Sequence, residues 1–304
     1  MKLRSLGFVL GLLAVMLACS FVGPVTTPVD QPSVETIVVE TLQALTPETA
    51  ASPIVPTAAA PATEAITLTG TAVTFGNVSL VNPIGLASNI SGVQVPAVGE
   101  ADGGPWGVGP AHIELTLDGY LLQDKFHKPK IYVYPAQEFA AANAGAAQSI
   151  IRLQTVLLNP AGPLSNDTLP NVPFFNAGQV FAAQTKVIQF KNGSGVRMLT
   201  EYAQYYATIN NNDLFYHFQG LTSDGKFYII AILPVTAPTL ANEDNPEAPV
   251  PAGGILFPGF DAPASDLEAY YNNITAAFNT AAPETFNPTI NILDALISSI
   301  QVLN

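Results

Sequence analysis

Apolar residues are distributed in two different ways along this chain, and the change falls near residue 66. From there on, short apolar or alternating segments are separated by turn residues, which is typical of strands joined by hairpins. The segments predicted to form strands are 66–75, 77–81, 112–120, 130–135, 183–190 and 196–209. Gly76–Asn77 and the run at 192–195 are predicted to form the turns.

Residues 214–233, LFYHFQGLTSDGKFYIIAIL, are predicted to be the central hairpin of the sheet. Asp224–Gly225 is placed at the two central positions of the turn, and this choice fixes the register. The predicted pairs are Thr222–Phe227, Gly220–Ile229, Phe218–Ala231, His217–Ile232 and Tyr216–Leu233. The face with Phe218 is almost wholly apolar and is assigned to the main core, whereas the face with His217 is mixed and is expected beneath a partial helix cover.

Three later segments have the apolar spacing of helices. Residues 136–159 carry one apolar stripe, residues 265–278 begin with a capping box formed by Ser265 and Glu268, and the last helix has Asn287–Pro288 at its start. The residues predicted to face inward are Phe139, Ala146, Ile150, Leu153, Leu157, Leu267, Tyr271, Ile274, Phe278, Leu293, Leu296, Ile297 and Ile300. Hairpins and about three helices predict an α+β fold, a mostly antiparallel sheet in an α-β-α sandwich, as one domain over 66–304.

The first residues have the pattern of a secretory signal peptide, which we assign to residues 1–18. Lys2 and Arg4 precede an uncharged apolar run, Leu6–Ala18, that is too short to span a bilayer comfortably. The only cysteine of the chain, Cys19, follows directly and has no partner for an internal disulfide.

The segment MLAC before Ser20 resembles the lipobox of bacterial lipoproteins. Ala18 and Cys19 fit that motif, whereas Met16 replaces the usual leucine and Leu17 is bulkier than usual. The resemblance implies that Cys19 carries lipid, such as palmitate, and attaches an extracytoplasmic protein to a membrane of the bacterial cell envelope. The alternative is an ordinary cleaved signal with an incidental cysteine.

Residues 19–65 are rich in proline, threonine and alanine, and the lipidated Cys19 is their first residue under this interpretation. They contain no sustained apolar period, so a disordered linker is predicted between the anchor and the domain. The order of elements after it is similar to that of PsbP-like α-β-α domains. That resemblance implies a non-enzymatic accessory or binding protein.

The composition of the chain and the motifs that it lacks argue against several classes of function. The net charge is −13, which repels phosphate backbones, so we expect no nucleic-acid partner. The three histidines lack metal-site spacing and only one cysteine is present, so no metal site is predicted. No nucleophile elbow, Walker loop or dinucleotide-binding glycine motif is present, and no cofactor is expected.

Two short segments contain candidate binding residues. The segment KFHKPK concentrates positive charge in an acidic chain and is a candidate anion site, with a solvated turn as the alternative. Its candidates are Lys125, His127, Lys128 and Lys130. Trp106, the only tryptophan, lies in a glycine-rich loop, where it either stacks on a ligand or plugs the loop onto the domain.

Three further features have stronger structural interpretations. Glu243, Asp244 and Glu247 lie in a long connection and could bind calcium, but a solvated acidic loop is favoured because the EF-hand spacing is missing. His217 is retained as a candidate, although a satisfied structural role is favoured. A set of aromatic residues indicates core packing more than a ligand groove. This set is Tyr202, Tyr205, Tyr206, Phe215, Tyr216 and Phe218.

The leading hypothesis is a lipid-anchored extracytoplasmic binding or accessory protein, with an envelope protein or a small ligand as its partner. One alternative is an extracytoplasmic hydrolase that uses carboxylates such as Glu114, Asp118 or Glu201. Another is a carbohydrate-binding surface built on Trp106 and the tyrosines. Carboxyl groups that converge in a pocket with perturbed pKa values would favour the enzyme. An aromatic groove without such groups would favour binding.

Overall fold

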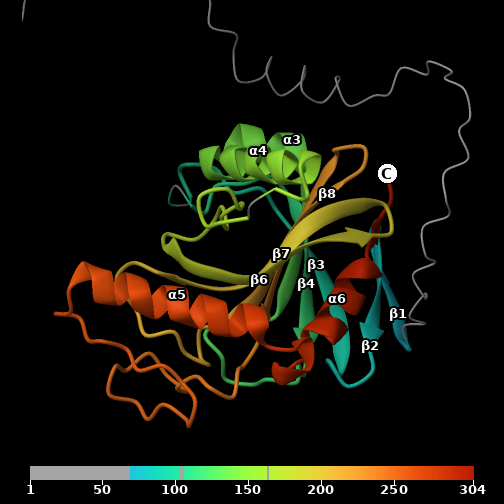
Figure 1. Cartoon of the computed structure of the whole chain (residues 1–304). Coiled ribbons are helices and arrows are strands. Elements are labelled where there is room, and N and C mark those ends of the chain that lie inside the picture. Colours follow the sequence, from blue (N-terminus) through green and yellow to red (C-terminus); the bar gives the residue numbers. More distant parts are fainter. Residues whose placement is uncertain (1–68, 103, 105, 163) are drawn as a thin grey trace, which may run out of the picture. The chain divides into compact units, whose positions relative to one another are not determined.

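The fold is known from a computed structural model that describes residues 69–102, 104, 106–162 and 164–304 (Figure 1). The predicted signal peptide, the lipidation of Cys19 and the predicted linker therefore lie outside the described residues. Among the helices of the described part, none combines the length and the apolar character that crossing a membrane requires.

Two antiparallel sheets organise the described residues. The larger sheet has the order β3-β4-β5-β9-β8-β7-β6, and the smaller has the order β1-β2-β10. The strands are β1 (Gly70–Phe75), β2 (Val78–Pro83), β3 (Asn89–Val95), β4 (His112–Asp118), β5 (Lys130–Pro135), β6 (Gly178–Phe190), β7 (Gly193–Ala203), β8 (Phe215–Thr222), β9 (Phe227–Pro234) and β10 (Gln301–Val302). The helices are α3 (Ala136–Ala142), α4 (Ala144–Leu158), α5 (Ala264–Thr280), the short 3-10 helix η1 (Pro283–Thr285) and α6 (Ile290–Ser298).

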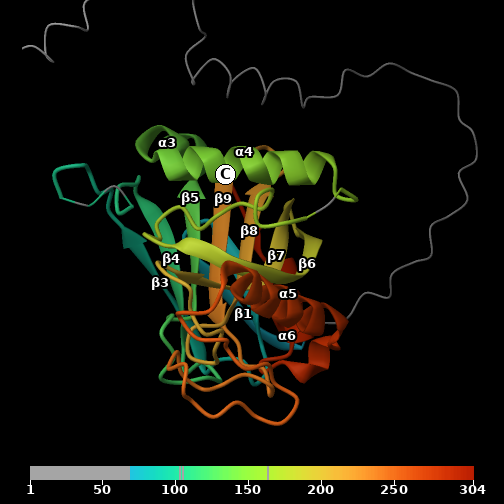
Figure 2. The same cartoon turned by 60° about the vertical axis from the view of Figure 1, so that its left-hand side comes forward.

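Helices cover both faces of the seven-stranded sheet (Figures 1 and 2). On one face, α3 and α4 pack with Ile230 and Ile232 of β9 in one apolar cluster. On the opposite face, α5, α6 and the small sheet pack with Ile229 and Ala231 in a larger cluster. The predicted α+β class and the mostly antiparallel sheet are confirmed, and the layers follow from the alternation of side chains along β9.

The central hairpin has the predicted register. Phe218 pairs with Ala231, His217 with Ile232 and Tyr216 with Leu233. The turn differs in detail, because the Gly225 amide donates to the Thr222 carbonyl at 2.8 Å. Its central residues are therefore Ser223 and Asp224, and Gly225 follows in the left-handed region at a φ of 71°, where glycine has no steric penalty.

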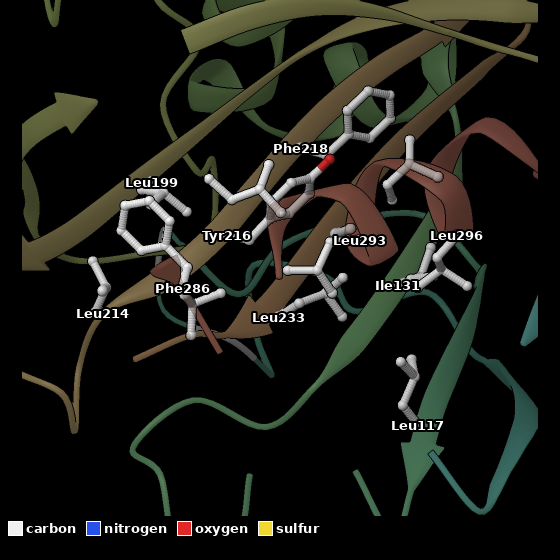
Figure 3. Packing of buried hydrophobic residues seen from close by; sticks show 14 of the residues in the cluster. Leu117, Ile131, Leu199, Leu214, Tyr216, Phe218, Leu233, Phe286, Leu293 and Leu296 are labelled. Atoms are coloured by element: carbon white, nitrogen blue, oxygen red, sulfur yellow. The ribbon is translucent and has the colours of Figure 1, made fainter. Parts of the chain in front are cut away.

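The larger apolar cluster includes α6, whose Leu293 lies beside Tyr216 and whose Leu296 lies beside Ile131 (Figure 3). A polar group fixes this helix in place. The Tyr216 hydroxyl donates to Asp294 Oδ1 at 2.8 Å, and the Arg197 Nε lies 3.2 Å from the same oxygen. The pairing of a buried arginine with an acid on α6 offsets the cost of removing both charges from water.

The predicted helix over 136–159 is two helices. Asn143 interrupts it in an extended conformation, and its side chain accepts a hydrogen bond from the Ala146 amide at 3.0 Å, which makes it the N-cap of α4. The capping box predicted for α5 is wrong, because Pro263 occupies the N-cap and the Ser265 hydroxyl donates to Asp266 instead.

Other helices and strands also begin or end at residues that differ from those predicted from the sequence. The N-cap of α6 is Thr289 rather than Asn287, and its four predicted inward residues are all buried. The strand β7 already begins at Gly193 and ends at Ala203, so only Lys191–Asn192 forms the turn. Neither β3 nor β10 was predicted, since β3 lacks an apolar run and β10 has two residues.

Candidate functional site

The candidate functional site is a cavity of about 560 Å³ beside the end of β7, which we call the aromatic pocket. Six aromatic side chains line it: Trp106, Phe126, Phe174, Phe175, Tyr202 and Tyr205. They come from four separate segments, so the sheet and its connections assemble the pocket from residues far apart in the sequence. Cavities of this size and lining are typical of small-molecule sites.

Trp106 enters the pocket from the connection between β3 and β4. An antiparallel bridge between Val98 and Gly109 closes the loop, and the Gly107 amide donates to the Gly104 carbonyl at 2.7 Å. The Asn143 side chain also donates to the Val108 carbonyl at 3.0 Å, which ties the loop to the start of α4. The indole remains 46% exposed although its loop is held at both sides.

Phe126 and His127 enter from the connection between β4 and β5. The Phe126 amide donates to the Asn212 carbonyl at 3.1 Å, which joins this loop to the loop before β8. The His127 ring stacks on Phe175 at 5.2 Å and meets Phe215 edge-on at 4.5 Å. Burial lowers the pKa of His127 to about 4, so its imidazole is neutral at pH 7.

Phe174 and Phe175 lie in the connection between α4 and β6, which several polar contacts hold against the sheet. Ser149 of α4 donates to the Asn171 carbonyl at 2.8 Å, and the Tyr202 hydroxyl accepts from the Val172 amide at 3.0 Å. The irregular chain therefore presents two adjacent phenylalanines to the pocket from a fixed backbone.

The loop of residues 210–213, NNND, forms the acidic side of the pocket. The Asn210 amide donates to Glu201 Oε2 at 3.2 Å. The side-chain amides of Asn210 and Asn212 each donate to an oxygen of Asp213 at 2.9 Å. Asn and Asp favour such local hydrogen bonds, which fix a loop without regular structure.

Glu201 is the most unusual group of the site, because its side chain is only 1% exposed yet lines the cavity. Its Oε2 accepts from the Asn210 amide, whereas Oε1 has no hydrogen-bond partner among the described residues. Burial raises the pKa of Glu201 well above its usual value, and the nearby carboxylates Asp213 and Asp244 act in the same direction.

The pocket is uniformly acidic. Glu201, Asp213 and Asp244 line it, and neither lysine nor arginine is present among the described lining residues. No cluster of three or more histidine, cysteine, aspartate or glutamate side chains in the described part of the chain could hold a metal ion.

His217 lies beneath the pocket in a closed polar network. Its Nδ1 lies 3.2 Å from the Ala231 carbonyl, and its Nε2 contacts the Gln219 side-chain amide, so Nδ1 carries the proton. Gln219 also donates to the Pro170 carbonyl at 3.0 Å and accepts from the Tyr228 hydroxyl. With every partner assigned, His217 acts as a structural group.

All four residues of the predicted basic patch, Lys125, His127, Lys128 and Lys130, line a second cavity of about 240 Å³. Lys130 forms an ion pair with Glu114 at 2.6 Å, which reduces the charge available to an anion. Asp118 and Asp124 also lie among the lining residues of this second cavity, where they offset the positive charge. Among the candidates of this segment, only His127 lines the aromatic pocket.

The residues of the predicted aromatic set lie on β7, on β8 and in the connection between these strands, and they have different surroundings. Tyr216 and Phe218 belong to the larger apolar cluster and Phe215 to the smaller one, whereas Tyr202 and Tyr205 line the pocket. The residues overlooked in the sequence are Phe174, Phe175 and the loop at 210–213. Paired phenylalanines outside any periodic element and the run NNND between two strands were the available signals.

Comparisons of this chain with protein-family models, with curated proteins and with solved structures give no match. The function must therefore be inferred from the chemistry of the site.

Proposed function

We propose that this chain is a lipid-anchored, extracytoplasmic binding protein whose small organic ligand occupies the aromatic pocket. The anchor rests on the basic start, the apolar run and Cys19 at its end. The binding function rests on the pocket itself.

The observation that carries the proposal is a large cavity that six aromatic side chains and Glu201 line, in which one oxygen of Glu201 accepts no hydrogen bond from the described residues. Phe126 and Tyr205 are 69% and 62% exposed. Exposed aromatic side chains gathered around one cavity cost free energy in water unless a ligand covers them. Elsewhere in the sheet, the aromatic residues of β8 are fully buried.

A second candidate function is hydrolysis, because carboxyl groups with perturbed surroundings do converge here. Glu201 has the raised pKa that a general acid requires, and Asp213 lies close enough to contribute to it. Both Asp213 oxygens already accept side-chain amide hydrogen bonds. A general base or nucleophile must reach its substrate, so this arrangement favours binding over catalysis.

Three soluble probes with a common phenyl ring test the binding function: benzyltrimethylammonium, phenyl β-D-glucopyranoside and phenyl phosphate. Trp106 is the only tryptophan of the chain and lines the pocket. Its fluorescence therefore reports directly on occupancy. We expect at least one probe to shift the emission saturably and to raise the Tm of the full chain.

Filling the cavity provides the matched control. Ala177→Phe places a bulky ring at the pocket lining, whereas Ala141→Phe makes the same change at an exposed position of α3. Ala177→Phe should abolish the response, and Ala141→Phe should retain it. If none of the three probes binds the wild-type protein, the proposed binding function is wrong. Release of phenol from the glucoside, lost in Glu201→Gln, would establish the hydrolase instead.

The anchor has its own test, which needs no ligand. We expect Cys19→Ala to move the protein from the membrane fraction to the soluble fraction of the cell envelope. A variant that remains as membrane-bound as the wild type would contradict lipidation at this residue.

A further inference from the structure

We propose that the aromatic pocket binds an organic cation, whose positively charged nitrogen lies between the carboxyl groups and the aromatic ring faces. The proposal rests on the binding function above, because it names the class of ligand for the same site. Four features of the described residues support it.

The first feature is the sign of the charge. Glu201, Asp213 and Asp244 line the cavity, and no described lysine or arginine does. His127 adds no positive charge at pH 7, because burial lowers its pKa to about 4. A cavity with negative charge on one side and low-dielectric walls concentrates cations and repels anions.

The second feature is the free oxygen of Glu201. This carboxyl group is almost fully buried, and the Asn210 amide binds only its Oε2. Oε1 accepts no hydrogen bond from the described residues, so it can accept one from a ligand in the cavity that supplies positive charge or a donor.

The third feature is the kind of aromatic residue. Phe126, Phe174 and Phe175 supply half of the six rings and have no polar atom with which to bind hydroxyl groups. The faces of aromatic rings attract cations, and most strongly where water is excluded. Rings and carboxylates around one space suit a cation better than a neutral sugar.

The fourth feature is the coupling between cation binding and the loss of the proton from Glu201. Burial and the neighbouring carboxylates raise the pKa of Glu201, so that its protonated form persists to higher pH in the empty pocket. A cation beside Glu201 stabilises the carboxylate, and the displaced proton passes to solvent. The affinity for a cation must therefore rise with pH over the range in which Glu201 titrates.

Choline and 3,3-dimethyl-1-butanol test the inference, since they have nearly the same shape and differ in charge. Both are titrated into the full chain, and binding is followed by Trp106 fluorescence and by calorimetry. We expect choline to bind at least about tenfold more tightly at pH 7.5, which corresponds to about 1.4 kcal/mol. We also expect the choline affinity to rise with pH in the wild type and to be nearly flat in Glu201→Gln.

Two adjacent carboxylates separate a local contact from the overall charge. Asp244 lines the pocket and Glu243 does not, and both are exposed. Asp244→Asn and Glu243→Gln remove the same charge from the chain. At about 0.05 M salt we expect Asp244→Asn to weaken choline binding about three- to tenfold and Glu243→Gln less than twofold.

Several outcomes would show that the ligand is not an organic cation and would leave the proposed binding function intact. These are equal affinities for choline and its neutral analogue, equal losses in the two carboxylate variants, and a choline affinity independent of pH in the wild type. Tighter binding of phenyl β-D-glucopyranoside or phenyl phosphate than of benzyltrimethylammonium would have the same meaning. If no probe binds at all, the binding function itself fails.

Discussion

Two neighbouring regions of this protein differ in whether their buried polar side chains have hydrogen-bond partners. The His217 network and the aromatic pocket meet at Tyr202, whose ring lies 6.5 Å from that of His217 and also lines the pocket. In the network, His217, Gln219 and Tyr228 satisfy one another.

In the pocket, one oxygen of Glu201 has no partner within the described residues, and the rings of Trp106, Phe126 and Tyr205 are exposed. Complete networks stabilise a fold, whereas incomplete ones beside a cavity cost stability and serve a ligand. The difference therefore separates residues held for structure from residues held for binding, although the two groups share a boundary.

The strongest test of this difference is to replace a glutamine by leucine in each of the two regions. Gln219→Leu leaves the His217 Nε2, the Tyr228 hydroxyl and the Pro170 carbonyl buried without their partner. Because each such group costs about 1–3 kcal/mol, we expect a loss of about 3–5 kcal/mol in the free energy of unfolding. The measurement is the midpoint of urea unfolding at constant m-value.

Gln204→Leu is the matched change in the pocket. Gln204 is exposed and donates to the Asn176 carbonyl at 2.7 Å, so water can replace the lost bond. We expect a change within about 0.5 kcal/mol. Similar losses for the two variants would show that the network is no more important to the fold than the pocket rim.

A second prediction uses the acid sensitivity of His217. Burial lowers its pKa to about 3, with a smaller contribution of the same sign from His127, while the bond to Ala231 opposes them. Below pH 6.5 the unfolded chain binds a proton that the folded chain does not, so the free energy of unfolding decreases as the pH falls toward 3.

Between pH 6.5 and 4.5 this contribution reaches about 2–3 kcal/mol, since one pKa unit corresponds to about 1.4 kcal/mol. We expect the stability of His217→Gln to fall less steeply than that of the wild type over this range. Parallel stability curves from urea unfolding at each pH would contradict the assignment of a buried neutral imidazole.

The sequence predicted the network far better than the pocket, and the reason is the range of the interactions. Alternation along β8 and β9 places His217 on the mixed face and Phe218 in the main core, and both placements are confirmed. A period of two residues and one turn were enough for that result, because both depend on neighbours along the chain.

The pocket depends on contacts between loops that have no period. Phe126 is bound to Asn212 through the backbone, and the Trp106 loop is tied to the start of α4 by Asn143. Trp106 and His127 were selected for their chemistry, but nothing in the sequence indicated that they share a cavity. Glu201 was named only as one of several carboxylates, since its burial is a property of the assembled fold.

A third prediction concerns the pocket, where we expect the opposite pH dependence of the free energy of unfolding from that predicted for His217. The pKa of Glu201 is raised, chiefly by burial, so the folded chain keeps a proton above pH 4.5 that the unfolded chain has lost. The free energy of unfolding therefore decreases as the pH rises through this range, whereas protonation of His217 decreases it as the pH falls.

Glu201→Gln retains an oxygen that can accept from the Asn210 amide but has no proton to lose. Its stability relative to the wild type should therefore increase as the pH rises from 5 to 8. Urea unfolding of both proteins at several pH values provides the comparison. A difference that stays constant or narrows with rising pH would mean that Glu201 is already ionised in the empty pocket.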